Sequence, residues 1–138
     1  LGVLGPTPPD PKLWATLEEL SGEVRALSGQ PDARRFGELN MAFFLAFHRI
    51  TSNIPLRELC ERLFFQTSRI WLQLMASAQI DVGTEVSIFG DEIDEVLRAL
   101  AINDVRSASL IHRAHISMSF ERMRKADEAR NRATRPTD

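Results

Sequence analysis

The stretch FGELNMAFFLAFHRITSNIP, residues 36–55, decides the fold that the sequence predicts. Its large apolar residues recur every three or four positions, the spacing that places side chains on one face of an α-helix. That row consists of Phe36, Leu39, Phe43, Phe47 and Ile50. A second row, at steps of four on an adjacent face, consists of Asn40, Phe44 and His48. The proline at the end of the stretch disfavours helical backbone at the residue before it, so we expect the helix to end there.

Helical spacing continues on both sides of this stretch. Upstream, Asp10 is expected to cap a helix that has Pro11 in its first turn and ends before Gly29. Downstream, a long helix is expected from about Leu56 to Ala78. Its apolar register comprises Leu56, Leu59, Cys60, Leu63, Phe64, Thr67, Ile70, Trp71, Leu74 and Met75.

Two further helices complete the pattern. The first has Thr84 or Ser87 as its expected cap, and Gly90 inside it costs about 1 kcal/mol relative to alanine, which leaves a break there open. Its apolar side comprises Val86, Phe89, Ile93, Val96, Leu97 and Leu100. The last helix follows a cap at Asp104 and extends to the region of Arg130. Its expected inward positions include Ala108, Ile111, His115 and Met118.

The predicted fold class is all-α, an antiparallel bundle of about five to six helices with short loops. No long segment alternates with the period of two that is typical of strands, and no Asn-Gly or Asp-Gly hairpin turn occurs. We expect residues 1–12 to form an extended leader or linker, residues 13–130 the helical domain, and residues 131–138 a flexible tail.

Composition excludes several classes of protein. With 43% hydrophobic and 26% charged residues in 138, the chain has the profile of one globular domain. A net charge of −2 argues against a strongly basic nucleic-acid-binding body. No apolar run approaches the roughly 20 residues that span a bilayer, so no membrane partner is expected. Cys60 is the single cysteine and cannot form an internal disulfide, so we expect a cytoplasmic protein.

Motifs for catalysis are missing. The chain contains no glycine-rich phosphate loop, no GxSxG and no HExxH, and we predict that it is not an enzyme. Cys60 lies on an apolar helical face and is interpreted as a buried structural thiol rather than a nucleophile. His112 and His115 are three residues apart and, with carboxylate help, form an alternative metal site. A pair of satisfied or surface histidines is the preferred interpretation.

The order of these segments resembles the FCD effector domain, the C-terminal ligand-sensing bundle of the FadR branch of GntR-type transcription regulators. The resemblance extends from about Leu13 to Arg124. FGELNMAFFLAFHRITSNIPL, residues 36–56, is similar to the first family motif, with Asn53 as the helix-ending asparagine. DEIDEVLRALAINDVRSASLIHRAH, residues 91–115, is similar to the second. It matches the family pattern at Ala99, Asp104, Ala108 and His115.

The resemblance also implies where a metal would be held in other members of the family. Those four positions carry Asn40, Phe44, Ile93 and His115 here. Phenylalanine and isoleucine offer no ligand atom, so we predict no metal and no cofactor. The former metal cavity is then either filled or retained as an apolar pocket, and the retained pocket is favoured because Asn40 and His115 keep polar atoms there. Arg69 would pair with a ligand carboxylate if it faced inward, the alternative being a surface arginine.

The function implied is that of a ligand-sensing and dimerisation domain. The predicted effector is a small organic acid or an apolar or amphipathic metabolite, and the predicted ligand-binding residues are Asn40, Phe44, Arg69, Ile93 and His115. The chain is expected to form a homodimer and to contact DNA only through a winged helix-turn-helix that lies outside these 138 residues. One alternative is a ligand-free helical dimerisation or interaction module, and another is a metal-binding helical protein that uses His112 and His115.

Overall fold

The computed structural model describes residues 11–77 and 80–135 and is all-α, which confirms the predicted fold class. Across those two ranges it contains five α-helices, one 3-10 helix and no β-strand. The helices are α1 (Pro11–Ser28), α2 (Ala33–Phe47), η1 (His48–Ile50), α3 (Ile54–Ala76), α4 (Val82–Ala101) and α5 (Val105–Ala133). The expected cap Asp10 lies outside the described residues. The division into residues 1–12, 13–130 and 131–138 stays a prediction.

Side-chain caps fix where four of the helices begin. The carboxylate of Asp32 accepts a hydrogen bond from the Arg34 backbone N–H, and the Asn53 side chain accepts one from Leu56. The cap of α4 is Asp81, which accepts from the Gly83 N–H at 3.0 Å. The prediction of Thr84 or Ser87 as this cap is therefore wrong. The helix starts earlier because the Asp81 carboxylate satisfies its first free donors.

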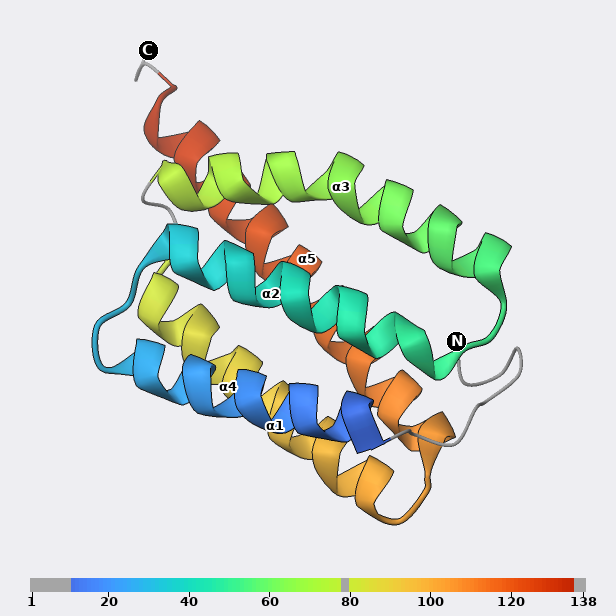
Figure 1. Ribbon diagram of the computed structural model, residues 1–138. Helices are drawn as coiled ribbons and strands as arrows, with labels where there is room; N and C mark the ends of the chain where they lie inside the picture. The colour runs from blue at the N-terminus through green and yellow to red at the C-terminus, as the bar shows by residue number, and fades with distance from the viewer. Residues whose placement is uncertain (1–10, 78–79, 136–138) are drawn as a thin grey trace.

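The core lies between α1, α2, α4 and α5. Figure 1 shows α1 and α4 side by side, with α2 above them and the long α5 crossing behind. The predicted apolar rows of α2 and α4 are confirmed, because their large side chains are buried in one cluster. That cluster includes Phe36, Leu39, Phe43, Phe47, Ile50, Val86, Phe89, Ile93, Val96 and Leu100. Helix α4 also runs through Gly90 without the break that the glycine left open.

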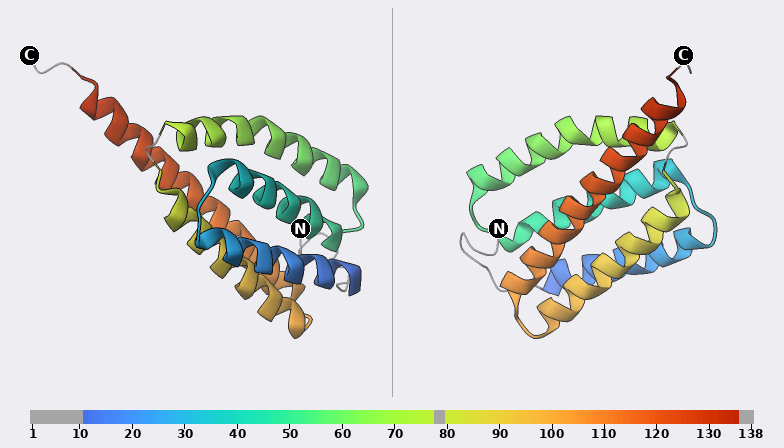
Figure 2. Two further views of the ribbon diagram at one scale, coloured as in Figure 1. Left: turned by 60° about the vertical axis from the view of Figure 1, so that its left-hand side comes forward. Right: turned by 180° about the vertical axis from the view of Figure 1, so that it is seen from behind.

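Helix α3 lies apart from this core. It arches over α2 and approaches the second half of α5, as both views of Figure 2 show. Only Met75 of its predicted apolar register is buried, whereas Leu59, Leu63 and Ile70 are 49%, 51% and 61% exposed. Most of this register therefore lies outside the core. Met118 of α5, also predicted to face inward, is about half exposed.

The connection between α4 and α5 aligns the two helices that carry the candidate site. Asn103 adopts the left-handed backbone conformation, with φ 57°, which asparagine tolerates better than most residues. Its N–H donates to the Leu100 carbonyl, and Asp104, the predicted cap of α5, accepts from the Ser107 N–H at 2.9 Å. This short turn makes α4 and α5 antiparallel neighbours and places residues 20 positions apart opposite one another.

Candidate functional site

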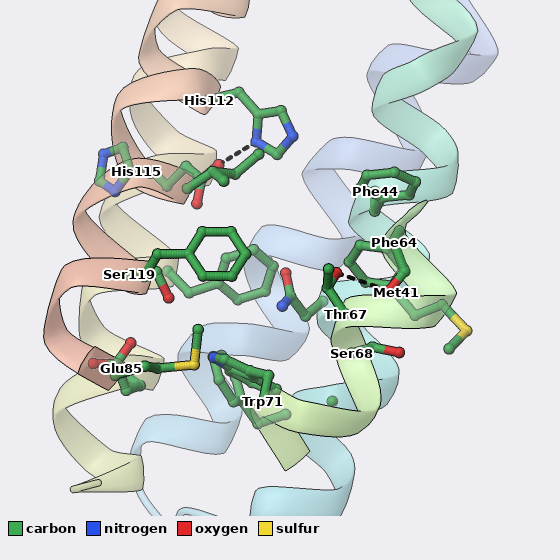
Figure 3. Close-up of a pocket in the computed structure, with 18 of the residues that line it drawn as sticks. Met41, Phe44, Phe64, Thr67, Ser68, Trp71, Glu85, His112, His115 and Ser119 are labelled. Carbon is green, nitrogen blue, oxygen red and sulfur yellow. Dashed lines mark hydrogen bonds and ion pairs between the residues drawn. The ribbon is translucent and has the colours of Figure 1, made fainter. Parts of the chain in front are cut away.

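A cavity of about 1040 Å³ separates α3 from the rest of the bundle. Figure 3 shows Phe64 and Trp71 of α3 on one side of it and His112 and Ser119 of α5 on the other. Aromatic rings form much of its wall. Phe44 stacks on Phe64 with ring centroids 4.0 Å apart. The pocket is thus retained rather than filled, and its walls suit an apolar molecule.

A buried histidine–carboxylate pair forms one polar region of this cavity. Nδ1 of His112 lies 2.6 Å from Oε1 of Glu92, and the two side chains are only 11% and 10% exposed. Nδ1–H donates to the carboxylate, so the tautomer is fixed by a charge-assisted hydrogen bond. Nε2 of His112 is buried and has no hydrogen-bond partner among the residues the structure describes. The ring points toward the cavity (Figure 3), so Nε2 is available to a bound molecule.

A second buried histidine stands beside this pair. Nδ1 of His48 donates to the Phe44 carbonyl oxygen at 2.6 Å, and the His48 and His112 ring centroids are 6.2 Å apart. Burial lowers the pKa of His48 from 6.5 to about 4, a fall that the Phe44 hydrogen bond opposes and the neighbouring His112 reinforces. His48 is therefore neutral at pH 7, and its Nε2 can only accept a hydrogen bond.

The lowered pKa of His48 is expected to make the fold less stable in mild acid. As pH falls, the unfolded chain takes up the His48 proton near pH 6.5, and the folded chain only near pH 4. The contribution is complete above pH 6.5, is lost between pH 6.5 and 4, and amounts to about 3 kcal/mol at most. Urea unfolding at pH 7, 5.5 and 4 measures this contribution. It is the difference between wild type and His48→Gln in how steeply the free energy of unfolding falls with pH. Identical pH profiles for the two proteins would contradict it.

An ion pair forms the other polar region. Arg122 of α5 holds Glu85 of α4 in a bidentate contact, with Nε–Oε1 and Nη2–Oε2 distances of 2.6 and 2.9 Å. Glu85 is buried, and both residues line the cavity. Each buried carboxylate of the cavity wall thus has its own cationic or histidine partner.

The five ligand-binding residues predicted from sequence occupy different environments. Asn40, Phe44 and His115 line the cavity, and Nε2 of His115 lies 3.2 Å from Oε2 of Glu95. Ile93 is fully buried in the core, and Arg69 is exposed; neither residue is part of the cavity wall. The structure therefore brings together three of the five.

The family metal does not fit these residues. Asn40 offers only a neutral amide, Phe44 offers no ligand atom, and the Ile93 side chain is buried in the apolar core. Within residues 11–77 and 80–135, no three or more histidine, cysteine, aspartate or glutamate side chains are placed to hold a metal ion. His112 and His115 each contact a different carboxylate instead. Cys60, expected to be buried, is half-buried and lines the cavity.

The ligand-binding residues predicted from sequence did not include His48, Glu85, Glu92 and Arg122, which line the cavity in the structure. A signal for the Glu92–His112 contact was present in the spacing. Glu92 and Glu95 precede His112 and His115 by the same 20 residues, with the turn between the two helices halfway along. Such a repeat predicts two rungs of contacts across an antiparallel helix pair.

Comparison with known protein families gives a match over most of the chain. A protein-family model described as the FCD domain matches residues 7–118 of the chain. No curated protein and no solved structure matches the chain. In the part of the chain that the structure describes, no helix is long and apolar enough to cross a membrane.

Proposed function

The chain belongs to the FCD family, the C-terminal domains of GntR-family transcription regulators, and from this we propose that it is the effector-sensing domain of such a regulator. The observation that carries the proposal is the cavity of about 1040 Å³ beneath α3. Its volume is at the upper end of the range for small-molecule sites. We place the protein in the FadR subfamily, in the cytoplasm, and without catalytic activity. DNA would be contacted by a separate winged helix-turn-helix.

The mechanism we propose is a shift between two arrangements of α3. Met75 is the buried residue of this helix, so its position depends on what occupies the cavity more than on the core. A molecule that contacts Phe64 and Trp71 of α3 and also His112 of α5 would favour the arrangement that closes on it. In a dimer, that shift would change how the DNA-binding domains are spaced.

Filling the cavity is expected to abolish ligand-induced stabilisation. A library of metabolites would be screened by thermal unfolding against wild type, Ser119→Trp, whose indole enters the cavity, and Ser87→Trp, an exposed position of α4 outside it. True ligands near 100-fold excess over Kd raise Tm by about 4 °C or more in wild type and Ser87→Trp, but not in Ser119→Trp. The proposal fails if no compound acts, or if both tryptophan variants respond alike.

Homodimerisation is a second proposed role, favoured by the outer face of α3. Leu59 and Ile70 share one stripe of this helix, do not line the cavity, and are 49% and 61% exposed. Exposed apolar rows of this kind are typical of interaction surfaces. We expect the chain to sediment as a dimer, and Leu59→Glu with Ile70→Glu to weaken association at least about tenfold. Ile102→Glu, at a 76% exposed position away from α3, is the control. A wild-type monomer at all concentrations refutes this role.

A further inference from the structure

We propose that the effector is a primary amine with an apolar body, and that its ammonium group donates a hydrogen bond to Nε2 of His112 beside the carboxylate of Glu92. The inference rests on the proposed effector-sensing function and names the class of ligand for that same cavity. It selects an amphipathic metabolite, and not an organic acid, from the predicted effectors.

His112 offers the ligand a buried hydrogen-bond acceptor. Its Nδ1–H is donated to Glu92, which leaves Nε2 of the uncharged ring with a lone pair and no proton. That Nε2 atom is buried and has no partner within the described part of the chain. Figure 3 shows the ring directed toward the cavity, where the ligand would lie. A buried polar atom without a partner costs stability, so a ligand that donates to Nε2 gains free energy that an acceptor cannot gain.

His48 adds a second acceptor to the same wall and no positive charge. Its Nδ1–H donates to the Phe44 carbonyl oxygen, so its Nε2 can also only accept. Burial lowers the pKa of His48 to about 4, so its ring is uncharged at pH 7.5 and does not repel a cation. An ammonium group has three N–H donors and no acceptor, and therefore matches a wall that presents acceptors.

Glu92 supplies the countercharge that a buried cation needs. Its carboxylate is buried against His112, and no arginine or lysine of the described residues forms an ion pair with it. The other buried carboxylate of the wall, Glu85, is already held bidentately by Arg122. Arg113 is exposed, so water and salt screen its repulsion of a cation in the cavity. The negative charge that lacks a cationic partner thus lies beside the free acceptor.

Aromatic rings suit both parts of such a ligand. Phe44 and Phe64 stack at 4.0 Å, Phe36 lies 5.0 Å from Trp71 by ring centroids, and all four line the cavity. The face of an aromatic ring attracts a cation within about 6 Å of its centroid, most strongly where water is excluded. The same rings accommodate a flat or extended apolar body.

Four compounds with one ring system test the class of ligand. Isothermal titration calorimetry of the full 138-residue chain at pH 7.5 would compare 2-(aminomethyl)naphthalene with 2-(hydroxymethyl)naphthalene, 2-naphthoate and trimethyl(2-naphthylmethyl)ammonium. The primary amine is a cation at this pH. We expect it to bind at least about tenfold more tightly than each of the other three. The alcohol lacks the charge, the carboxylate has the opposite charge and no donor, and the trimethylammonium compound has no N–H.

Glu92→Gln tests the countercharge, because it removes the charge with little change of volume. The amine should lose at least about tenfold in affinity, and the alcohol less than about threefold, which also shows that the variant is folded. The matched control is Glu95→Gln, since Glu95 pairs with His115, is 43% exposed and is not part of the cavity wall. Neither affinity should change in this control. The ranking of the four compounds uses wild type and does not depend on the stability of a variant.

Each other outcome overturns the proposal. Tightest binding of 2-naphthoate would assign an acid site, and equal binding of amine and alcohol would show that charge is not recognised. Equal binding of the two cations would assign recognition by the rings without His112, and equal losses in Glu92→Gln and Glu95→Gln would exclude Glu92 as the countercharge. Binding by none of the four, while library ligands still distinguish Ser119→Trp from Ser87→Trp, would refute the amine class and leave effector sensing standing. Absence of both responses would refute the effector-sensing function itself.

Discussion

Replacing Phe43 by alanine is expected to lower the free energy of unfolding by about 3–5 kcal/mol. Phe43 is fully buried on α2 and contacts three rings, one on its own helix and one each on α4 and α5. It stacks on Phe47 at 5.7 Å and meets the edges of Phe89 and His112 at 5.5 Å. Its removal leaves a cavity at the junction of α2, α4 and α5, on top of the lost burial of the ring.

The matched control is Phe65→Ala on α3. Phe65 is 47% exposed, and its ring contact is with Phe64 on the same helix. Its loss is expected to cost about 1 kcal/mol or less. Urea unfolding monitored by circular dichroism at pH 7 would measure both variants. Equal costs for the two substitutions would mean that α2 does not form the centre of the core.

The contrast between these phenylalanines explains which part of the fold the sequence predicts. Helices α2 and α4 are covered by neighbours, so their apolar period reports directly on burial. Helix α3 has an equally clear period, but periodicity shows only that one face is apolar. It does not show whether that face meets the core, a cavity or a partner. The exposure of Leu59 and Ile70 therefore depends on tertiary packing and cannot be predicted from the apolar period alone.

The candidate site was predictable in part for a related reason. Asn40 and Phe44 lie one helical turn apart on α2. The resemblance to the family placed both on the cavity wall, and both line the cavity in the structure. Adjacent helical residues differ by about 100° in direction. At the next motif, Ile93 enters the core, and its neighbour Glu92 faces the cavity instead. An alignment by position alone cannot distinguish these two directions.

Contacts between residues far apart in the sequence were harder still to predict. The charged residues around Arg122 in the sequence indicate a solvated helix face. Arg122 nevertheless pairs with Glu85, 37 residues away. Arg69 shows the opposite case. It lies on a helix beside the cavity, but its side chain is exposed to solvent. Both results depend on how α3 and α5 are rotated about their axes, which packing sets and local sequence does not.

Breaking the Glu92–His112 pair on one side is expected to cost about as much as the loss of Phe43. Glu92→Leu and His112→Leu should each lower the free energy of unfolding by about 3–5 kcal/mol, because each leaves the other polar group buried without its partner. The double leucine variant should recover most of that loss, since two apolar side chains of suitable size replace a buried pair with little net cost. Urea unfolding of the four proteins at pH 7 gives the coupling energy.

The neighbouring rung of the same two helices supplies the control. His115 and Glu95 repeat the residue types and the spacing, but their nitrogen and oxygen are 3.2 Å apart, and the Glu95 side chain is 43% exposed. Water satisfies an exposed carboxylate when its partner is removed, so the coupling energy of this pair should be below about 1 kcal/mol. Equal coupling in the two cycles would show that burial does not distinguish the rungs.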